Sequence, residues 1–441
     1  DPGASTATHT ARERKPPAVS PQLPDGMRWP QSGAISSENA QPELHRPLSI
    51  YVHVPFCRVR CGYCDFNTYT VGFGPGADRD TYADSASSEI SLAARVLDEA
   101  GLGQTPARTV FFGGGTPTML DTSAHARMLH DLADRIGIVQ GAEVTCEANP
   151  ETVDEQSVKR LADAGVTRLS VGMQSAVPRI LHTLDRQHRP ERVGQVIEWA
   201  RAAGLDVSVD IIYGTPGESL DDWATTVQAA CDLQPDHISA YALVIEDGTK
   251  MAAQVAHGQL PMPDPDDEAD KYELLDQMIR SAGYRWYEIS NFAREEADEA
   301  GLPATELRHA SRHNLAYWRD WNWWGFGPGA HSHIGRARWW NVKHPRAWAG
   351  RLRSAQSPAA AGEILDDQTR YLERVLLRVR TSDGIALGDV AAHAGRENAS
   401  QTCHRLRDEG LLDSEALERG HIALTLRGRL LADYVTRELT D

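Results

Sequence analysis

Three cysteines within eight residues are the side chains with the clearest chemistry in this chain. They lie in the segment Cys57-Arg-Val-Arg-Cys61-Gly-Tyr-Cys64, whose two arginines are expected to favour the thiolate form of the sulfurs. A loop this short can surround one metal centre. A structural zinc site needs four closed ligands, and His53 or Asp65 could supply the fourth. Three thiolates instead suit a 4Fe-4S cluster with one iron open to an outside ligand, and the spacing favours this cluster over zinc.

The composition excludes several classes of function. The chain has 441 residues, of which 41% are hydrophobic and 24% charged, as expected for a globular protein of two or three domains. No run of about 18 apolar residues occurs, so we expect no integral membrane segment. Acidic residues outnumber basic ones by 62 to 45, giving a formal charge of −17, and no basic run is evident, so we expect no nucleic-acid partner. Six cysteines in so long a chain indicate a reducing cytoplasm rather than a disulfide framework. A contact with the inner face of the membrane would be transient, because no basic amphipathic helix is evident.

The cysteine segment follows the first of six short runs rich in β-formers. These runs are Leu48–Val54, Thr109–Phe112, Ala142–Glu147, Arg168–Met173, Val207–Tyr213 and His237–Val244. Stretches with helical spacing of apolar residues separate the later runs, and this alternation predicts a parallel α/β fold. Six strands are too few for a closed eight-stranded barrel. A partial (β/α)6 barrel or an open sheet remains.

Polar residues and glycines follow these strands where each one ends. They include the cysteine segment after the first strand, Gly113-Gly-Gly-Thr-Pro117 after the second, and Glu147, Gln174 and Asp210 at the next three. Parallel βα folds build their sites at the carboxyl ends of strands. The sequence therefore predicts that these groups share one site.

Composition divides the chain into four segments. Residues 1–46 lack periodicity and are expected to form a disordered tail, and residues 47–290 carry the predicted barrel. Residues 291–360 form an aromatic-rich segment, and eight of the 11 tryptophans lie between Trp286 and Trp348. Residues 361–441 predict a small, mainly helical domain whose order of elements resembles a winged helix, with a hairpin around residues 421–428.

The CxxxCxxC spacing, the GGGTP after the second strand and the six-strand cadence together resemble the radical S-adenosylmethionine (SAM) superfamily over about residues 48 to 245. The resemblance implies a 4Fe-4S cluster held by Cys57, Cys61 and Cys64, with the open iron chelated by the methionyl amine and carboxylate of SAM. It also implies that the reduced cluster can pass an electron to the sulfonium, which releases a 5′-deoxyadenosyl radical.

Longer strings narrow this resemblance. YVHVPFC, CGYCDFN, FFGGGTPT, EANPE, VGMQS, DIIYGTPGES and AYALVIEDGT resemble the group of the oxygen-independent coproporphyrinogen III oxidase, HemN, and its relatives. The positions that match SAM contacts in this group are Tyr51, Gly114, Gly115, Thr116, Glu147, Gln174, Arg186, Asp210 and Ala242. In the decarboxylating oxidase a further cysteine stands two residues after the third cluster cysteine. This chain has Asp65 and Phe66 there, so we expect no coproporphyrinogen oxidase activity.

His313-Asn314-Leu-Ala-Tyr317-Trp318 reads HNxxYW, the string that marks the haem-chaperone branch of this group. An imidazole is a common axial haem ligand, and the aromatic pair offers flat apolar area for a porphyrin face. The following WNWWGFGPGAHSH adds aromatic walls and two more candidate ligands, His331 and His333. The alternative is that the aromatic residues only pack the barrel against the C-terminal domain. The resemblance favours haem binding.

Two functions of different class follow. In the first, the protein binds haem and delivers it to acceptor apoproteins such as respiratory-chain haem proteins, while the cluster and SAM support binding, homodimer formation or transfer. In the second, it is a radical SAM enzyme that oxidises or methylates a tetrapyrrole. The missing fourth cysteine and the HNxxYW string both favour the chaperone.

Overall fold

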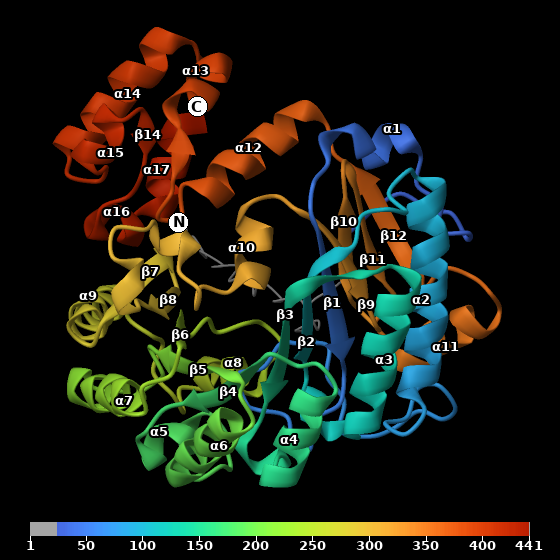
Figure 1. Ribbon diagram of the computed structural model, residues 1–441. Helices are drawn as coiled ribbons and strands as arrows, with labels where there is room; N and C mark the ends of the chain where they lie inside the picture. The colour runs from blue at the N-terminus through green and yellow to red at the C-terminus, as the bar shows by residue number, and fades with distance from the viewer. Residues whose placement is uncertain (1–23, 441) are drawn as a thin grey trace, which may run out of the picture.

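A twelve-stranded sheet organises the part of the chain that the computed structural model describes, residues 24–440 (Figure 1). Its six central strands are parallel and neighbour one another in chain order. They are β1 (Leu48–Val54), β2 (Ala107–Gly114), β3 (Ile138–Ala148), β4 (Arg168–Gln174), β5 (Asp206–Tyr213) and β6 (His237–Ala242). Each overlaps one of the six runs expected from the sequence. The expected partial (β/α)6 barrel is confirmed, and its two edges are not paired with each other.

Helices cover the outside of this curved sheet (Figure 1). They are α2 (Tyr82–Glu99), α3 (Thr122–Arg135), α4 (Glu155–Asp163), α5 (Pro178–Thr183), α6 (Pro190–Ala202), α7 (Leu220–Asp232) and α9 (Pro265–Ser281). The short α8 (Lys250–Ala256) lies instead beside the cysteine segment, where Met251 N donates to the Gly62 carbonyl oxygen at 2.9 Å. Short 3-10 turns are η2 (Pro117–Met119), η3 (Pro150–Thr152), η4 (Ala297–Glu299) and η5 (Ala304–Glu306). Within residues 24–440, no helix combines the length and the apolar character that crossing a bilayer requires.

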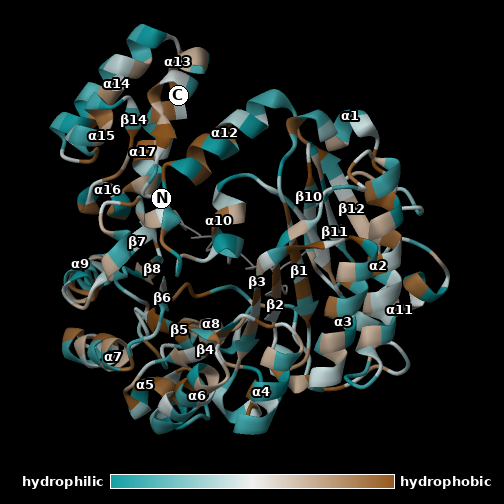
Figure 2. Ribbon diagram, in the orientation of Figure 1, coloured by the Kyte–Doolittle hydropathy of each residue, from teal (hydrophilic) through white to brown (hydrophobic). Residues whose placement is uncertain are grey.

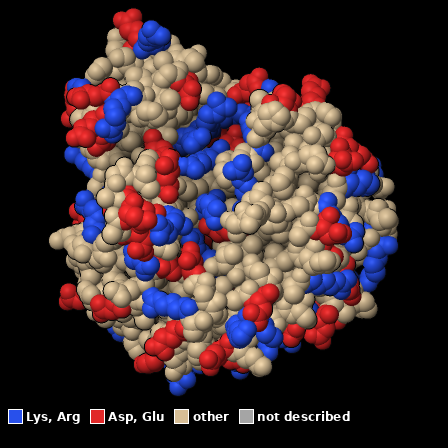
Figure 3. All heavy atoms as spheres, viewed as in Figure 1, with Lys and Arg blue, Asp and Glu red and all other residues tan. Residues whose placement is uncertain are grey.

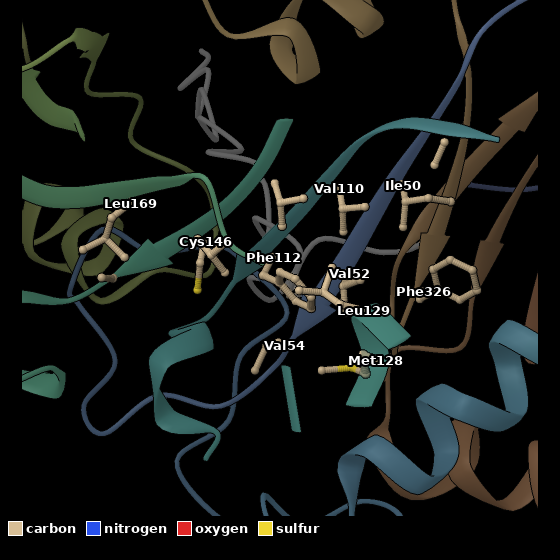
Figure 4. Close-up of a cluster of buried hydrophobic side chains, with 14 of the residues drawn as sticks. Ile50, Val52, Val54, Val110, Phe112, Met128, Leu129, Cys146, Leu169 and Phe326 are labelled. Carbon is tan, nitrogen blue, oxygen red and sulfur yellow. The ribbon is translucent and has the colours of Figure 1, made fainter. Parts of the chain in front are cut away.

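The alternation of side chains along the strands separates the core from the barrel interior. Ile50, Val52 and Val54 on β1 share one face and are buried. Figure 4 shows them in one cluster with residues of β2, β3, β4, α3 and β9, namely Val110, Phe112, Cys146, Leu169, Met128, Leu129 and Phe326. Because side chains of a strand point to opposite faces in turn, Tyr51 and His53 face the barrel interior. Burial of the hydrophobic face of β1 therefore determines that its polar side chains point into the barrel.

Six further strands extend the sheet at both edges. They are β7 (Tyr284–Glu288), β8 (Asn291–Arg294), β9 (Asn322–Phe326), β10 (His331–Ile334), β11 (Ala337–Asn341) and β12 (Ala359–Ile364), with α10 (Arg312–Trp318) and α11 (Pro345–Arg353) between them. Strand β9 pairs in parallel with β1, and β8 pairs with β6 and β7 in antiparallel fashion. The expected domain boundary at residue 290 is therefore wrong, because it divides the β7–β8 pair.

The aromatic-rich segment is mainly a packing element. Trp324, Trp339 and Trp340 on β9 and β11, and Trp348 on α11, are almost fully buried. The expectation that residues 291–360 form a haem-binding segment is not met for these four tryptophans, which fill the core. Their neighbours are the sheet and its helices rather than the C-terminal domain that the alternative interpretation named.

Part of the expected N-terminal tail is folded. Residues 1–23 of that tail lie outside the described residues, but residues 24–46 contain α1 (Ser37–Ala40) and η1 (Pro42–Leu44). Met27 pairs with Gly362 on β12, and the Trp29 ring stacks on Trp339 with 5.4 Å between ring centroids. The prediction of disorder is wrong for residues 24–46, because their partners lie at the other end of the sequence.

The C-terminal residues form a mainly helical module with its own hydrophobic cluster, as expected. Its elements are α12 (Asp367–Arg378), β13 (Ile385–Ala386), α13 (Leu387–Ala394), α14 (Arg396–Asp408), α15 (Ser414–Glu418), β14 (His421–Ile422), α16 (Leu426–Leu430) and α17 (Ala432–Thr440). The hairpin expected around residues 421–428 is wrong, because β14 pairs with the distant β13 and α16 begins at Leu426. Figure 2 shows α14 and α15 mostly in the teal of hydrophilic residues.

Candidate functional site

The carboxyl ends of the parallel strands surround a cavity of about 410 Å³. This volume lies in the range of about 300–1,000 Å³ that is usual for small-molecule sites. Of the predicted cluster and SAM residues, all but Tyr51 line the cavity: Cys57, Cys61, Cys64, Gly114, Gly115, Thr116, Glu147, Gln174, Arg186, Asp210 and Ala242. The fold thus brings together residues that the sequence spreads over nearly 190 positions.

The three thiols are unpaired by disulfides and line the same wall of the cavity. The Thr116 hydroxyl donates to Cys57 Sγ at 3.7 Å, and Arg186 Nη1 donates to Cys61 Sγ at 3.7 Å. Burial raises the pKa of Cys57, and it raises the pKa of Cys64 to about 11. The charge of Arg60 does lower the pKa of Cys64, as expected, but burial outweighs it. A bound cation would supply the missing stabilisation.

The donor set fits an iron–sulfur cluster better than a single zinc ion. The three sulfur atoms do not all lie within 4.8 Å of one another, whereas two thiolates on one tetrahedral zinc are about 3.8 Å apart. His53 does not offer a fourth ligand, because its Nδ1 lies 3.1 Å from the Tyr51 hydroxyl and its Nε2 lies 2.9 Å from the Asn67 carbonyl oxygen. Three separated sulfurs suit a larger inorganic group with one open corner.

Glycines after β2 make room beside the thiols. A Cβ on Gly115 would lie 2.7 Å from the Phe56 carbonyl oxygen and 3.1 Å from Cys57 Sγ. Gly114 has φ +107°, and a Cβ there would lie 2.5 Å from the His53 ring. The backbone can therefore approach a ligand closely at this point only because both residues are glycine.

Two half-buried carboxylates, Glu147 and Asp210, form the floor of the cavity. Burial and then the charge of Asp210 raise the pKa of Glu147 to about 8, although Gly114 N donates to its Oε2 at 3.2 Å. Burial raises the pKa of Asp210 to about 6, while hydrogen bonds from Ser239 and Ser170 oppose the shift. A cationic ligand would favour the ionised form of both groups.

Arg186 provides a cation at the opposite side. Its Nη2 donates to the Gly172 carbonyl oxygen at 3.0 Å, and its buried Nε has no hydrogen-bond partner among the described residues. Gln174 stands beside it with φ 61°, and an irregularity between Gly172 and Gln174 shifts the pairing of β4 with β5. An unpaired guanidinium donor can bind a ligand carboxylate.

The sequence analysis missed the apolar rim of this cavity. Val59, Phe66 and Val244 line it and are 42%, 57% and 62% exposed, respectively. Each lies within a few residues of a predicted site residue, which is the signal that could have identified it.

Tyr51 lines a second cavity of about 180 Å³ deeper in the barrel. Glu147, Asp210 and Tyr241 border both cavities. His313, Asn314 and Tyr317 of the HNxxYW string line the far side of this second cavity. The string forms α10, which packs against β2, β9 and α12 and covers this end of the barrel (Figure 1).

His313 is not an open ligand in this arrangement. Its side chain is buried, its Nδ1 lies 2.8 Å from the Thr109 hydroxyl, and its Nε2 lies 3.0 Å from the Tyr317 hydroxyl. Burial lowers the pKa of His313 to about 3, so the ring is neutral. This cavity of about 180 Å³ is below the usual range for a ligand of the size of haem, and haem binding by the string stays a prediction.

The other residues of the string are hydrogen-bonded, and the two further histidines differ in exposure. Asn314 Nδ2 donates to Glu288 Oε1 at 3.0 Å, and Trp318 Nε1 donates to Asn314 Oδ1 at 3.2 Å. His333 is buried 3.4 Å from Asp320, and neither of its ring nitrogens has a hydrogen-bond partner in the described part of the chain. Of the candidate haem ligands His313, His331 and His333, all within the described residues, only His331 is exposed.

A cavity with three separated thiols at the carboxyl ends of six parallel strands is the architecture of a radical SAM protein, and the Radical SAM superfamily matches residues 51–230. The chain is 44% identical to the Mycobacterium tuberculosis (strain CDC 1551 / Oshkosh) protein named "Heme chaperone HemW" over 395 residues, 89% of this chain and 95% of that protein. It is 31% identical to the Bacillus subtilis protein of the same name, with 88% and 97% covered. The chain belongs to the HemW family of radical SAM proteins.

A solved structure supports the fold. The Escherichia coli coproporphyrinogen III oxidase HemN, described as a Radical SAM enzyme, matches with a TM-score of 0.72 at 22% identity. The match covers 89% of this chain and 90% of that one. The similarity at this level concerns the arrangement of helices and strands.

Proposed function

We propose that this protein is a haem chaperone, which binds haem and delivers it to acceptor haem apoproteins such as those of the respiratory chain. One observation carries the proposal: the 44% identity to a "Heme chaperone HemW" extends over 95% of that relative. The similarity therefore includes the α10 segment as well as most of the barrel.

The first cavity would hold the resident cofactors. Cys57, Cys61 and Cys64 would ligate a 4Fe-4S cluster, and the remaining lining residues would bind SAM, with Tyr51 supporting them from the second cavity. When reduced, the bound cluster supplies one electron to the sulfonium of SAM. Glu147 and Asp210 suit a cationic amine or ribose hydroxyls, and the free Nε of Arg186 suits a carboxylate.

The HNxxYW residues His313, Asn314, Tyr317 and Trp318 would form the haem site. The neutral imidazole of His313 is the form that ligates iron. Its Nε2 must first exchange the Tyr317 hydroxyl for the metal. A displacement of α10 or of the Tyr317 side chain would therefore accompany haem binding.

A haem titration of the anaerobically reconstituted protein tests this function. We expect a Soret band that saturates on adding haem, and a loss or marked weakening of it in His313→Ala with an unchanged band in His257→Ala, which alters an exposed histidine. Circular dichroism of both variants checks that they fold. The proposal fails if the wild-type protein gives no Soret band and instead turns over coproporphyrinogen III repeatedly with SAM and reductant.

The place of action belongs to the same proposal. A cytoplasmic protein is consistent with six cysteines that are all free. A transient encounter with the inner face of the membrane would occur where the acceptor is a membrane enzyme, and a homodimer is compatible with the chaperone role.

A further inference from the structure

Five arginines from three distant segments gather beside α10, and we call them the arginine patch: Arg46, Arg319, Arg370, Arg374 and Arg378. Arg46 and Arg370 both pair with Asp320, at 3.5 Å and 3.1 Å. Burial, and then the charges of Arg319 and Arg374, lower the pKa of Arg378, and burial with the charge of Arg374 lowers that of Arg46. Figure 3 shows blue side chains gathered in the hollow between the C-terminal helices and the barrel.

The patch has fewer anions than cations, although the whole chain carries a formal charge of −17. Asp320 forms ion pairs with both Arg46 and Arg370, and Asp383 pairs with Arg319 at 3.0 Å. Among residues 24–440, neither Arg374 nor Arg378 has a carboxylate at ion-pairing distance. Two guanidinium groups therefore remain without a direct counterion in an otherwise acidic molecule.

This concentration of cations has an energetic cost. Arg370, Arg374 and Arg378 follow one another at four-residue spacing on α12, and like charges at this spacing destabilise a helix. Partial burial adds to the effect, because it lowers the pKa of Arg378 and of Arg46. A favourable interaction with the helix C-terminus accounts for Arg378 alone. An anionic ligand would offset the cost for the whole patch.

The patch adjoins the HNxxYW string. Arg319 directly follows Trp318 at the end of α10, and α10 packs against α12. A porphyrin that contacts the exposed side of Trp318 therefore has arginines within the same hollow.

We infer that the arginine patch binds the propionate carboxylates of haem, with Arg374 and Arg378 as their principal partners. The inference rests on the proposed haem-binding function and deepens it. Guanidinium groups bind carboxylates through paired, charge-assisted hydrogen bonds, and two neighbouring unpaired arginines match two propionates on one edge of a porphyrin.

Titrations with haem and with haem dimethyl ester, whose propionates carry no charge, test the inference on the full-length protein. We expect Arg374→Gln/Arg378→Gln to weaken haem binding by about tenfold or more, since each lost contact is a hydrogen bond to a charged group. Binding of the ester should not change. Arg396→Gln/Arg419→Gln, which removes two exposed arginines at the start of α14 and just after α15, should bind haem as the wild type does.

The outcomes separate the inference from the function on which it rests. Unchanged haem affinity in the patch variant overturns the inference and leaves the chaperone function intact. The inference is also overturned if the patch variant binds haem with unchanged affinity but transfers it more slowly to an acceptor. The patch would then bind an acidic partner protein. A wild-type protein that binds no haem overturns both.

Discussion

At the residue scale, unpaired donors and the spacing between side chains define the site as much as the contacts that its residues make. The sulfurs of Cys57, Cys61 and Cys64 do not all lie within 4.8 Å of one another, and Arg186 keeps a buried donor unpaired. The sequence predicted the residues of the cluster well, because their spacing is local. It could not predict that Tyr51 lies in a different cavity or that both ring nitrogens of His313 are bonded, since these contacts join distant strands.

Replacing any one of Cys57, Cys61 and Cys64 with serine should remove the cluster. Each sulfur is one of only three ligands, so we expect the brown chromophore and the bound iron of the anaerobically reconstituted protein to fall to background. Cys231→Ser, which changes an isolated cysteine, is the matched control and should keep its iron. Full iron content in any of the three variants would refute the ligand assignment.

Arg186→Ala should weaken SAM binding while the iron stays bound. The guanidinium faces the cavity beside the Cys61 sulfur, and losing hydrogen bonds to a charged ligand group costs about tenfold or more in affinity. Equilibrium dialysis of SAM and an iron assay measure the two effects separately. Arg189→Ala, at an exposed neighbouring position, should change neither, and an unchanged SAM affinity in Arg186→Ala would contradict the role.

Glu147→Gln should stabilise the protein while it weakens SAM binding. The pKa of Glu147 is about 8 in the folded protein, against about 4.3 in an unfolded chain. Its contribution to stability is therefore full below about pH 4.3 and is lost as the pH rises to about 8. We expect the gain in Tm of the variant over the wild type to grow across this window and then level off. Glu151→Gln, at an exposed position nearby, should show no such dependence, and a pH-independent gain in Glu147→Gln would contradict the assignment.

At the element scale, local pattern located the six parallel strands because each is a short buried run between turn signals. β1 matches its predicted bounds at both ends. The additional strands β7 to β12 were not predicted, since their pairing with β6 and β1 is not encoded in local periodicity. The tryptophan-rich segment was predicted to bind haem for the same reason. Local sequence does not distinguish a tryptophan that fills a core from one that contacts a ligand.

Glu89 links α2 to the extended sheet. Its carboxylate accepts hydrogen bonds from Gly327 N, Asn341 Nδ2 and Trp348 Nε1 at 2.9, 2.7 and 2.8 Å. Glu89→Ala leaves the buried Gly327 N and Trp348 Nε1 unpaired, while Asn341 Nδ2 keeps its bond to the Gly327 carbonyl oxygen. We expect the variant to lower the free energy of unfolding by about 3 kcal/mol or more. Glu99→Ala, at an exposed position at the end of the same helix, should cost less than about 1 kcal/mol. Equal denaturation midpoints for the two variants would show that Glu89 does not join these elements.

At the scale of the whole molecule, long-range assembly creates features that no window of sequence contains. The sequence shows no basic run, yet the fold collects Arg46, Arg319 and three arginines of α12 into one patch. Residues 24–46 lack periodicity, yet Trp29 finds its partner on β11. The cavity lined by the three cysteines and the second cavity, which α10 borders, lie in one barrel interior. Glu147 and Asp210 line both cavities. The shared residues therefore connect the cofactor cavity to the string that we propose binds haem.

Transfer of haem to an acceptor tests the central claim most directly. The protein, loaded with haem and reconstituted with its cluster, is mixed with an apo-form of a haem protein, and the Soret spectra of the two separated proteins are recorded over time. The account predicts that the donor loses its Soret band as the acceptor gains its own, and that Cys231→Ser transfers haem as the wild type does. A donor that keeps its haem in the presence of competent acceptors, with or without SAM, would contradict the account.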